Sequence, residues 1–134
     1  MGSPMPVMSL FICDRLARLE IHGILLRLGA VPDPGGRGWI VEPTRWHRVF
    51  VQDTTADIDL IPHDTLNAAG RAFGGSRLHK TWPRTHLTLS YRDGPGDLAL
   101  RNVWTIGQAF LNRSPTVLDD HAGAQYLLDR SSPW

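Results

Sequence analysis

The feature of this sequence that most restricts its fold is the alternation of apolar and polar side chains in HLTLSY, residues 86–91. Leu87, Leu89 and Tyr91 fall on one side of an extended chain, and the three polar residues fall on the other. Pro83 before the segment and Asp93-Gly94 after it are typical of boundaries. The pattern predicts a β-strand with one buried face, and therefore a sheet.

Helical periodicity occurs in the same chain. Val103, Ile106 and Phe110 have the spacing of one helix face, which predicts a helix ending near residue 112. Residues 9–28 predict a helix capped by Ser9 and stopped by Gly29. Shorter helices are predicted over residues 64–73 and after residues 119–120.

The remaining apolar segments predict strands. Residues 38–42 and 46–52 predict a hairpin, residues 57–61 a third strand, and residues 97–101 a strand pairing with residues 86–91. Together these predict an α+β fold with the order α-βββ-α-ββ-α: a single small domain with an antiparallel sheet of about five strands and helices packed on it. We expect the domain to span residues 9–129. Residues 1–8, which include a vector-like Met1-Gly2-Ser3, and the tail 130–134 lie outside it.

Composition narrows the class of protein. The chain of 134 residues is long enough for one core without metal or disulfide support, and Cys13 is its only cysteine. No apolar run approaches the roughly 18 residues of a membrane span, and no signal-peptide pattern opens the chain. We expect a cytoplasmic protein without membrane contact. Motifs of nucleotide-binding loops, serine hydrolases and zinc proteases are absent from the sequence.

The predicted first helix is apolar on two sides. Ile12, Leu16, Leu19 and Leu26 share one face, and the opposite face is formed by Ile21, Ile24, Leu25 and Leu28. One face would pack on the sheet and leave the other to a partner. Trp104, which lies off the apolar stripe of its helix, is a second candidate contact because tryptophan is frequent in protein interfaces. These residues predict a non-enzymatic binding or adaptor protein that docks to another protein or forms a homo-oligomer.

The charge is uneven. Residues 65–92 carry five basic residues and no acid, although the formal net charge of the chain is +1. Arginines and a lysine that hold phosphates beside an aromatic ring that stacks on a base are typical of single-stranded nucleic-acid binding. An alternative function is therefore a nucleic-acid-binding module, with the candidate residues Arg71, Arg77, Lys80, Trp82 and Arg84.

Two short strings repeat the pattern H-x-T-L, at His63–Leu66 and His86–Leu89. On a strand, the histidine and threonine of such a string point the same way, so the histidine can transfer a proton while the threonine holds a phosphate oxygen. Two facing copies resemble the active site of the two-histidine phosphoesterase family, whose members cleave cyclic or 2′–5′ phosphodiesters. The resemblance implies an enzyme alternative, a small phosphodiesterase using His63, Thr65, His86 and Thr88.

Asp57, Asp59 and His63 are the best candidates for binding a divalent cation, because the two aspartates share one face of the predicted strand. Two aspartates on an exposed edge strand have a plainer role in preventing edge pairing. We assign no metal and no cofactor. Without a catalytic spacing, the apolar and aromatic surplus favours the binding protein over both alternatives.

Overall fold

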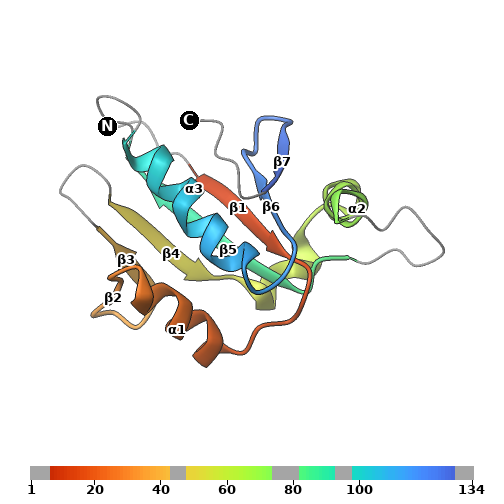
Figure 1. Cartoon of the computed structure of the whole chain (residues 1–134). Coiled ribbons are helices and arrows are strands. Elements are labelled where there is room, and N and C mark those ends of the chain that lie inside the picture. Colours follow the sequence, from red (N-terminus) through yellow and green to blue (C-terminus); the bar gives the residue numbers. More distant parts are fainter. Residues whose placement is uncertain (1–6, 43–47, 74–81, 93–97, 129–134) are drawn as a thin grey trace.

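The computed structural model describes residues 7–42, 48–73, 82–92 and 98–128. Within these ranges, seven strands form one antiparallel sheet in the order β2-β3-β4-β5-β1-β6-β7 (Figure 1). The strands are β1 (Val7–Ile12), β2 (Val31–Pro32), β3 (Trp39–Val41), β4 (Val49–Asp53), β5 (Thr85–Tyr91), β6 (Thr116–Asp119) and β7 (Gln125–Leu127). The helices are α1 (Arg18–Arg27), the 3-10 helix η1 (Thr55–Leu60), α2 (His63–Ala72) and α3 (Leu98–Leu111).

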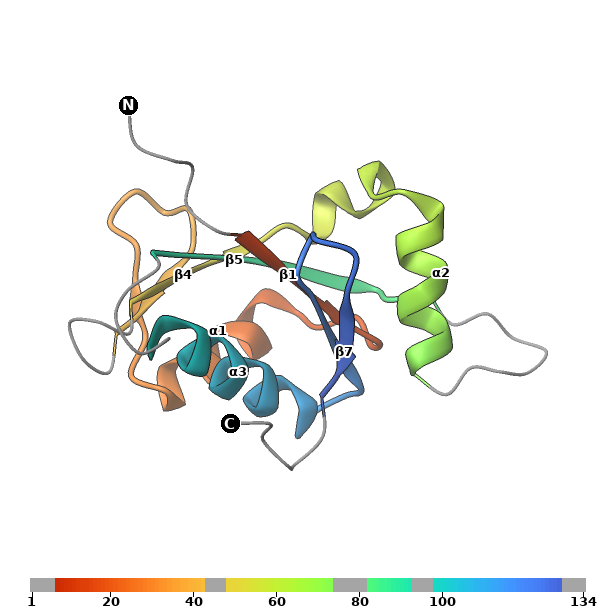
Figure 2. The same ribbon diagram turned by 90° about the horizontal axis from the view of Figure 1, so that it is seen from above.

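The α+β class and the antiparallel sheet are confirmed, with seven strands in place of about five. Helices cover both faces of this sheet. Figure 2 shows α1 and α3 beneath the sheet, η1 above it, and α2 to the right of β1 and β7. The larger core lies between the sheet and α1 and α3, and includes Leu10, Leu89, Ile106 and Phe110. A smaller core under α2 contains Phe11, Leu66, Ala69 and Val117.

Strand β1 lies near the middle of the sheet, paired with β5 on one side and β6 on the other. The prediction of a single helix over residues 9–28 is wrong, because residues 9–12 form this strand and α1 begins only at Arg18. Leu10 and Ile12 enter the larger core while Phe11 enters the smaller one. Apolar residues at successive positions therefore indicated a strand buried on both faces.

Three further predictions are wrong. Residues 57–61 lie in or next to η1, and residues 98–101 are the first turn of α3. The helix predicted after residues 119–120 is replaced by the hairpin of β6 and β7. Its turn is closed by the Asp120 carboxylate, which accepts hydrogen bonds from the amides of Ala122 and Ala124, so aspartates read as a helix cap stabilise a turn instead. Strands β3, β4 and β5 and helices α2 and α3 are found where the sequence predicts them.

Strand β1 starts at Val7, inside the segment expected to precede the domain. Among the described residues, no helix is both long enough and apolar enough to cross a membrane.

Candidate functional site: an arginine-lined cleft

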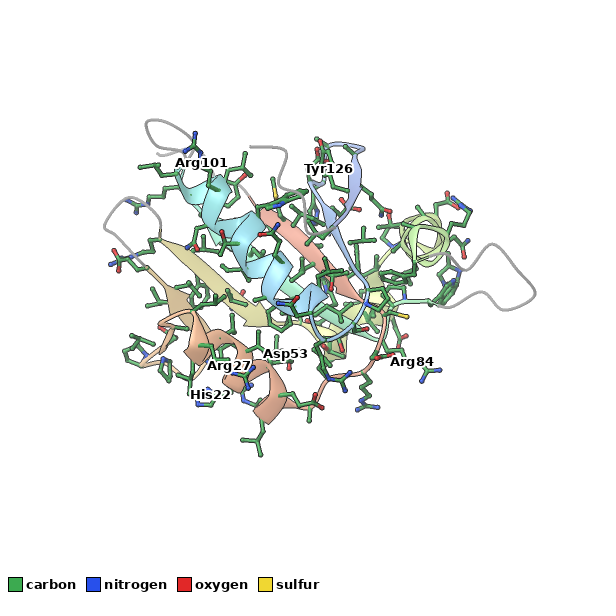
Figure 3. All side chains as sticks on the ribbon, viewed as in Figure 1. His22, Arg27, Asp53, Arg84, Arg101 and Tyr126 are labelled. Atoms are coloured by element: carbon green, nitrogen blue, oxygen red, sulfur yellow. The ribbon has the colours of Figure 1, made fainter. Side chains whose placement is uncertain are left out.

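A cleft of about 1350 Å³ opens where β1 and β4 end and β5 begins. We call it the arginine cleft. Arg15, Leu16, Ala17 and Arg18 form one wall, Asp53, Thr55, Ala56, Ile58 and Asp59 form another, and Leu66, Trp82, Pro83 and Arg84 complete it. Figure 3 shows Asp53 and Arg84 toward the bottom of the view, away from Arg101 and Tyr126.

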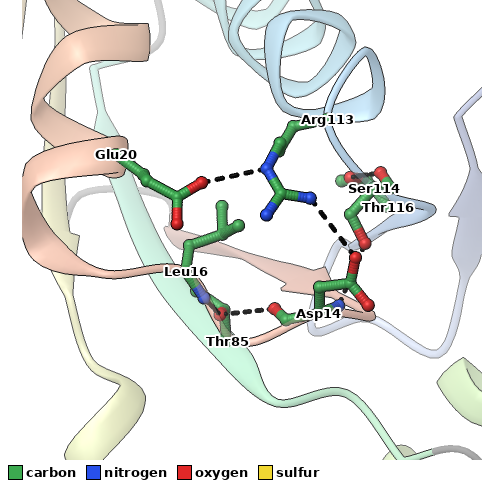
Figure 4. Close-up of polar contacts among 7 residues, drawn as sticks. All are labelled: Asp14, Leu16, Glu20, Thr85, Arg113, Ser114 and Thr116. Atoms are coloured by element: carbon green, nitrogen blue, oxygen red, sulfur yellow. Dashed lines mark hydrogen bonds and ion pairs between the residues drawn. The ribbon is translucent and has the colours of Figure 1, made fainter.

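Hydrogen bonds fix the backbone that carries Arg15. The amide of Leu16 donates to Thr85 Oγ1 at 2.8 Å, and the same hydroxyl donates to the carbonyl of Asp14 at 2.7 Å (Figure 4). The amide of Asp14 donates to Ser114 Oγ at 3.0 Å. Both neighbours of Arg15 are therefore anchored to other strands or turns, so its Cα position is set before any ligand binds.

The other two arginines are also held by their surroundings. The amide of Arg84 donates to the carbonyl of Ile12 at 3.0 Å, which extends the pairing of β1 with β5 by one bond. The guanidinium of Arg18 lies 5.1 Å from the ring centroid of Trp39, within the range of a cation–π contact. Among the described residues, Arg15 and Arg84 form no ion pair and no side-chain hydrogen bond.

Arg113 presents the opposite case. Its guanidinium pairs with Glu20 at 2.9 Å and with Asp14 at 3.4 Å (Figure 4). The hydrogen bond that the guanidinium donates to Glu20 is the main reason that the pKa of Arg113 is raised. Asp14 and Glu20, which lie in and just after the β1–α1 linker (residues 13–17), are thus paired with Arg113 and not with the arginines of the cleft.

The wall formed by residues 53–59 combines acidic, polar and apolar side chains. Asp53 Oδ1 accepts a hydrogen bond from the amide of Thr55 at 3.1 Å, and Asp59 lies on η1. Leu60, next to Asp59, is 81% exposed, and Leu19, next to Arg18, is 82% exposed. On two walls, a charged lining residue is therefore followed in the sequence by an exposed apolar residue.

Trp82 closes one end of the cleft and is 38% exposed. Its indole N–H donates to Asn67 Oδ1 at 2.7 Å, and its ring is tilted against His63 with centroids 5.1 Å apart. The ring is held in place yet retains an open edge, which is the usual state of a tryptophan in a binding surface.

A second polar cluster lies on the sheet face that α2 and η1 cover. His86 Nδ1 is 2.9 Å from Thr54 Oγ1, and His86 Nε2 is 2.8 Å from Ser9 Oγ. Ser9 Oγ is 2.7 Å from His121 Nε2, and Thr54 Oγ1 is 2.9 Å from Thr88 Oγ1. We call this set, Thr88, Thr54, His86, Ser9 and His121, the hydroxyl–histidine chain.

His86, at the centre of the hydroxyl–histidine chain, is buried and has partners for both ring nitrogens. His86 is 5% exposed and stacks on Phe11, with centroids 4.9 Å apart and an interplanar angle of 18°. Both of its ring nitrogens have hydroxyl partners. Burial lowers the pKa of His86, so the imidazole is neutral near pH 7. These are properties of a satisfied buried network, which stabilises and orders a fold.

The two H-x-T-L strings have different surroundings. His86 and Thr88 lie on β5, but His63 and Thr65 lie in the first turn of α2. His63 is exposed and contacts Trp82, whereas His86 contacts Phe11, Ser9 and Thr54. The expected pair of facing strands is therefore not formed by these two segments.

The residues predicted to bind a partner on the first helix lie against the core. Ile21 and Leu25 are fully buried, and Ile24 and Leu28 pack on the same core from partly buried positions. Trp104 is buried as well. The exposed apolar residues of α1 are Leu19 and Leu26. Ile12 and Leu16, which the sequence placed on one helix face with them, precede α1 and are buried in the larger core.

Three of the five residues predicted to bind nucleic acid, Arg71, Trp82 and Arg84, are described by the structure. Arg77 and Lys80 lie outside the described residues, and Arg71 is exposed in the last turn of α2. Of the three described residues in this set, Trp82 and Arg84 line the arginine cleft. Sequence reasoning missed Arg15 and Arg18, because a helix predicted through residue 12 concealed the linker that brings them beside Arg84.

No metal centre is indicated: in the described part of the chain, no three His, Cys, Asp or Glu side chains are placed to hold an ion. Asp57 and Asp59 lie on η1 and not on a strand. Burial, followed by the charge of Asp14, raises the pKa of the Cys13 thiol, which disfavours the nucleophilic thiolate.

No protein-family model, no curated protein and no solved structure matches this chain.

Proposed function

We propose that this chain is a non-enzymatic binding domain that docks another protein at the arginine cleft. The observation that carries the proposal is the fixed placement, beside Trp82, of Arg15 and Arg84, which have no carboxylate partner within the part of the chain that the structure describes. Arginine and tryptophan are the residue types that contribute most to protein–protein binding energy.

The size and composition of the cleft support a macromolecular ligand over a small molecule. Small-molecule sites are typically enclosed, mostly apolar and about 300–1000 Å³ in volume. This cleft is larger, at about 1350 Å³, and exposed charged residues form much of its lining. Leu19 and Leu60, the sequence neighbours of the lining residues Arg18 and Asp59, are exposed apolar side chains that a large partner would cover.

The nucleic-acid alternative shares Trp82 and Arg84 with the cleft. A nucleic-acid site presents a continuous positive track to successive phosphates. Asp53 and Asp59 interrupt such a track here, because they line the same cleft as the three arginines. The mixture of charges favours a protein surface, which also carries both signs and apolar side chains.

Site-specific photo-crosslinking in the cells that produce the protein tests the proposal. A benzoylphenylalanine replaces Leu60 beside the cleft or, as a matched control, Tyr126, which is also exposed but lies on β7. We expect a protein adduct from position 60 and not from position 126, and its loss when Arg15→Glu and Arg84→Glu are added. Adducts of equal yield from both positions, or none from position 60, would overturn docking at the cleft. An adduct of twice the chain mass identifies the partner as a second copy.

A further inference from the structure

We infer that the arginine cleft selects an acidic peptide segment, with carboxylates at Arg15, Arg18 and Arg84 and an apolar side chain between them. The inference rests on the proposed function and names the chemistry of the partner. Its basis is the combination, in one cleft, of three held arginines with the apolar lining residues Leu16, Ile58, Leu66 and Trp82.

The arginines of the cleft are suited to bind carboxylates. Within the described ranges, Arg15 and Arg84 have no carboxylate partner, and the side-chain contact of Arg18 is with the ring of Trp39. A guanidinium offers several N–H donors in a planar fork that matches a carboxylate. Because the backbone of Arg15 and Arg84 is already fixed by hydrogen bonds, binding orders little more than the side chains.

The local helix geometry adds to the same preference. Arg18 is the first residue of α1, and Ala17 at the N-cap has no side chain that accepts a hydrogen bond from the first turn. The partial positive charge of this helix end therefore adds to the charges of the arginines. The acid of the first turn, Glu20, is paired with Arg113.

The apolar lining of the cleft favours a ligand that carries an apolar side chain in addition to its negative charges. Leu16 is buried, and Ile58, Leu66 and Trp82 line the cleft from three other segments. Leu16 and Leu66 are already covered by the protein, so Ile58 and Trp82 supply the apolar surface that an isolated phosphate or carboxylate leaves uncovered. A peptide with a leucine or an aromatic residue between two acids covers it, and its carboxylates reach the surrounding arginines.

Asp53 and Asp59 set a limit on the charge of the ligand. They face the same space as the arginines, so a uniform polyanion meets repulsion on one wall. A short acidic segment places its carboxylates on the arginine side only. This arrangement separates an acidic peptide from a nucleic-acid strand.

The test selects random dodecapeptides displayed on phage against the whole chain. Recovered peptides are then synthesised, and their affinities are measured by fluorescence anisotropy against wild type and three variants. The first variant, Arg15→Glu with Arg84→Glu, reverses two cleft charges. The second, Arg27→Glu with Arg101→Glu, makes the same charge change at exposed arginines that do not line the cleft (Figure 3). The third, Trp82→Ala, alters the cleft without changing its charge.

We expect peptides with acids on both sides of an apolar residue. Their affinity falls at least about tenfold in the Arg15→Glu, Arg84→Glu variant and much less in the Arg27→Glu, Arg101→Glu variant. Peptides without enriched acids that lose affinity with Trp82→Ala would overturn the acidic-segment inference and leave docking at the cleft in place. Peptides unaffected by all three variants, or no peptides at all, would overturn both. Tighter binding of an oligothymidylate than of any peptide would overturn the inference in favour of nucleic acid.

Discussion

The arginine cleft and the hydroxyl–histidine chain lie on connected strands, but they differ in whether their polar side chains have partners inside the protein. In the hydroxyl–histidine chain, both ring nitrogens of His86 form hydrogen bonds with hydroxyl groups of the protein. In the cleft, Arg15 and Arg84 are exposed and unpaired among the described residues, although their backbone is firmly held. A polar group whose partners are internal contributes to stability, whereas one that is fixed without a partner is available for a ligand.

The largest effect on stability is expected from His86→Ala. The substitution removes a buried ring stacked on Phe11 and leaves Ser9 and Thr54 without one hydrogen-bond partner each. We expect the free energy of unfolding in urea to fall by about 2–4 kcal/mol. Arg84→Ala, two residues away, is the control and should change it by less than about 0.5 kcal/mol. Equal effects of the two substitutions would erase the distinction between the regions.

Thr85→Val tests the bond that anchors the wall of the cleft. Valine keeps the shape of the side chain but cannot accept from the Leu16 amide or donate to the Asp14 carbonyl. Because Thr85 is fully buried, we expect a loss of about 1–2 kcal/mol in unfolding free energy, together with weaker binding at the cleft. Thr105→Val, at an exposed threonine on α3, is the matched control and should have little effect. Unchanged binding in a destabilised Thr85→Val would show that the anchoring does not serve the cleft.

The pH dependence of stability provides a third test. Burial lowers the pKa of His86, with a smaller contribution from the charge of His121, while the bond with Thr54 and the charges of Asp57 and Asp119 act in the other direction. The unfolded chain therefore binds a proton at a higher pH than the folded chain. Stability that is present above about pH 6.5 is lost as the pH falls below it, by at most about 1.4 kcal/mol per pH unit.

The measurement compares the urea unfolding of wild type and His86→Gln between neutral pH and mildly acidic pH. We expect the variant to be less stable at neutral pH and to lose less stability on acidification. Parallel curves for the two proteins would contradict a neutral, buried His86.

Arg113→Ala is expected to have the smallest effect on stability. Its two ion pairs, with Glu20 and Asp14, are exposed to solvent, and such pairs contribute little because water screens them. We expect no change in unfolding beyond experimental error. The substitution releases two carboxylates beside the β1–α1 linker, however, and should weaken the binding of an acidic peptide measurably. A loss of stability as large as that of Thr85→Val would assign these pairs a structural role.

The sequence predicted those parts of the fold whose pattern is local. The alternation in residues 86–91 and the helical spacing of Val103, Ile106 and Phe110 report directly which face is buried, and β5 and α3 were found where they were expected. Residues 9–12 could not be assigned in this way, since β1 is buried on both faces and has no alternation. Its length of six residues and its separation from α1 by Asp14 and Arg15 were the available signals.

The candidate site was harder to predict than the fold because its residues come from four separate segments: residues 15–18, 53–59, 66 and 82–84. Trp82 and Arg84 were identified from the basic stretch, but their neighbours Arg15 and Arg18 follow from the pairing of β1 with β5. That pairing is a long-range contact. A helix assigned through residue 12 also led to the wrong choice of outer face, so Ile21 and Leu25 were favoured over Leu19.

The most direct test of the account measures affinity and stability on the same protein. The affinity for an acidic peptide selected on wild type and the unfolding free energy in urea are determined for Arg15→Glu with Arg84→Glu, and for Arg27→Glu with Arg101→Glu. The account predicts that the cleft variant loses affinity at least about tenfold while its unfolding free energy stays within about 1 kcal/mol of wild type, and that the control variant retains its affinity. Equal loss of affinity in both variants, or unchanged affinity in the cleft variant, would contradict a binding role for the arginine cleft.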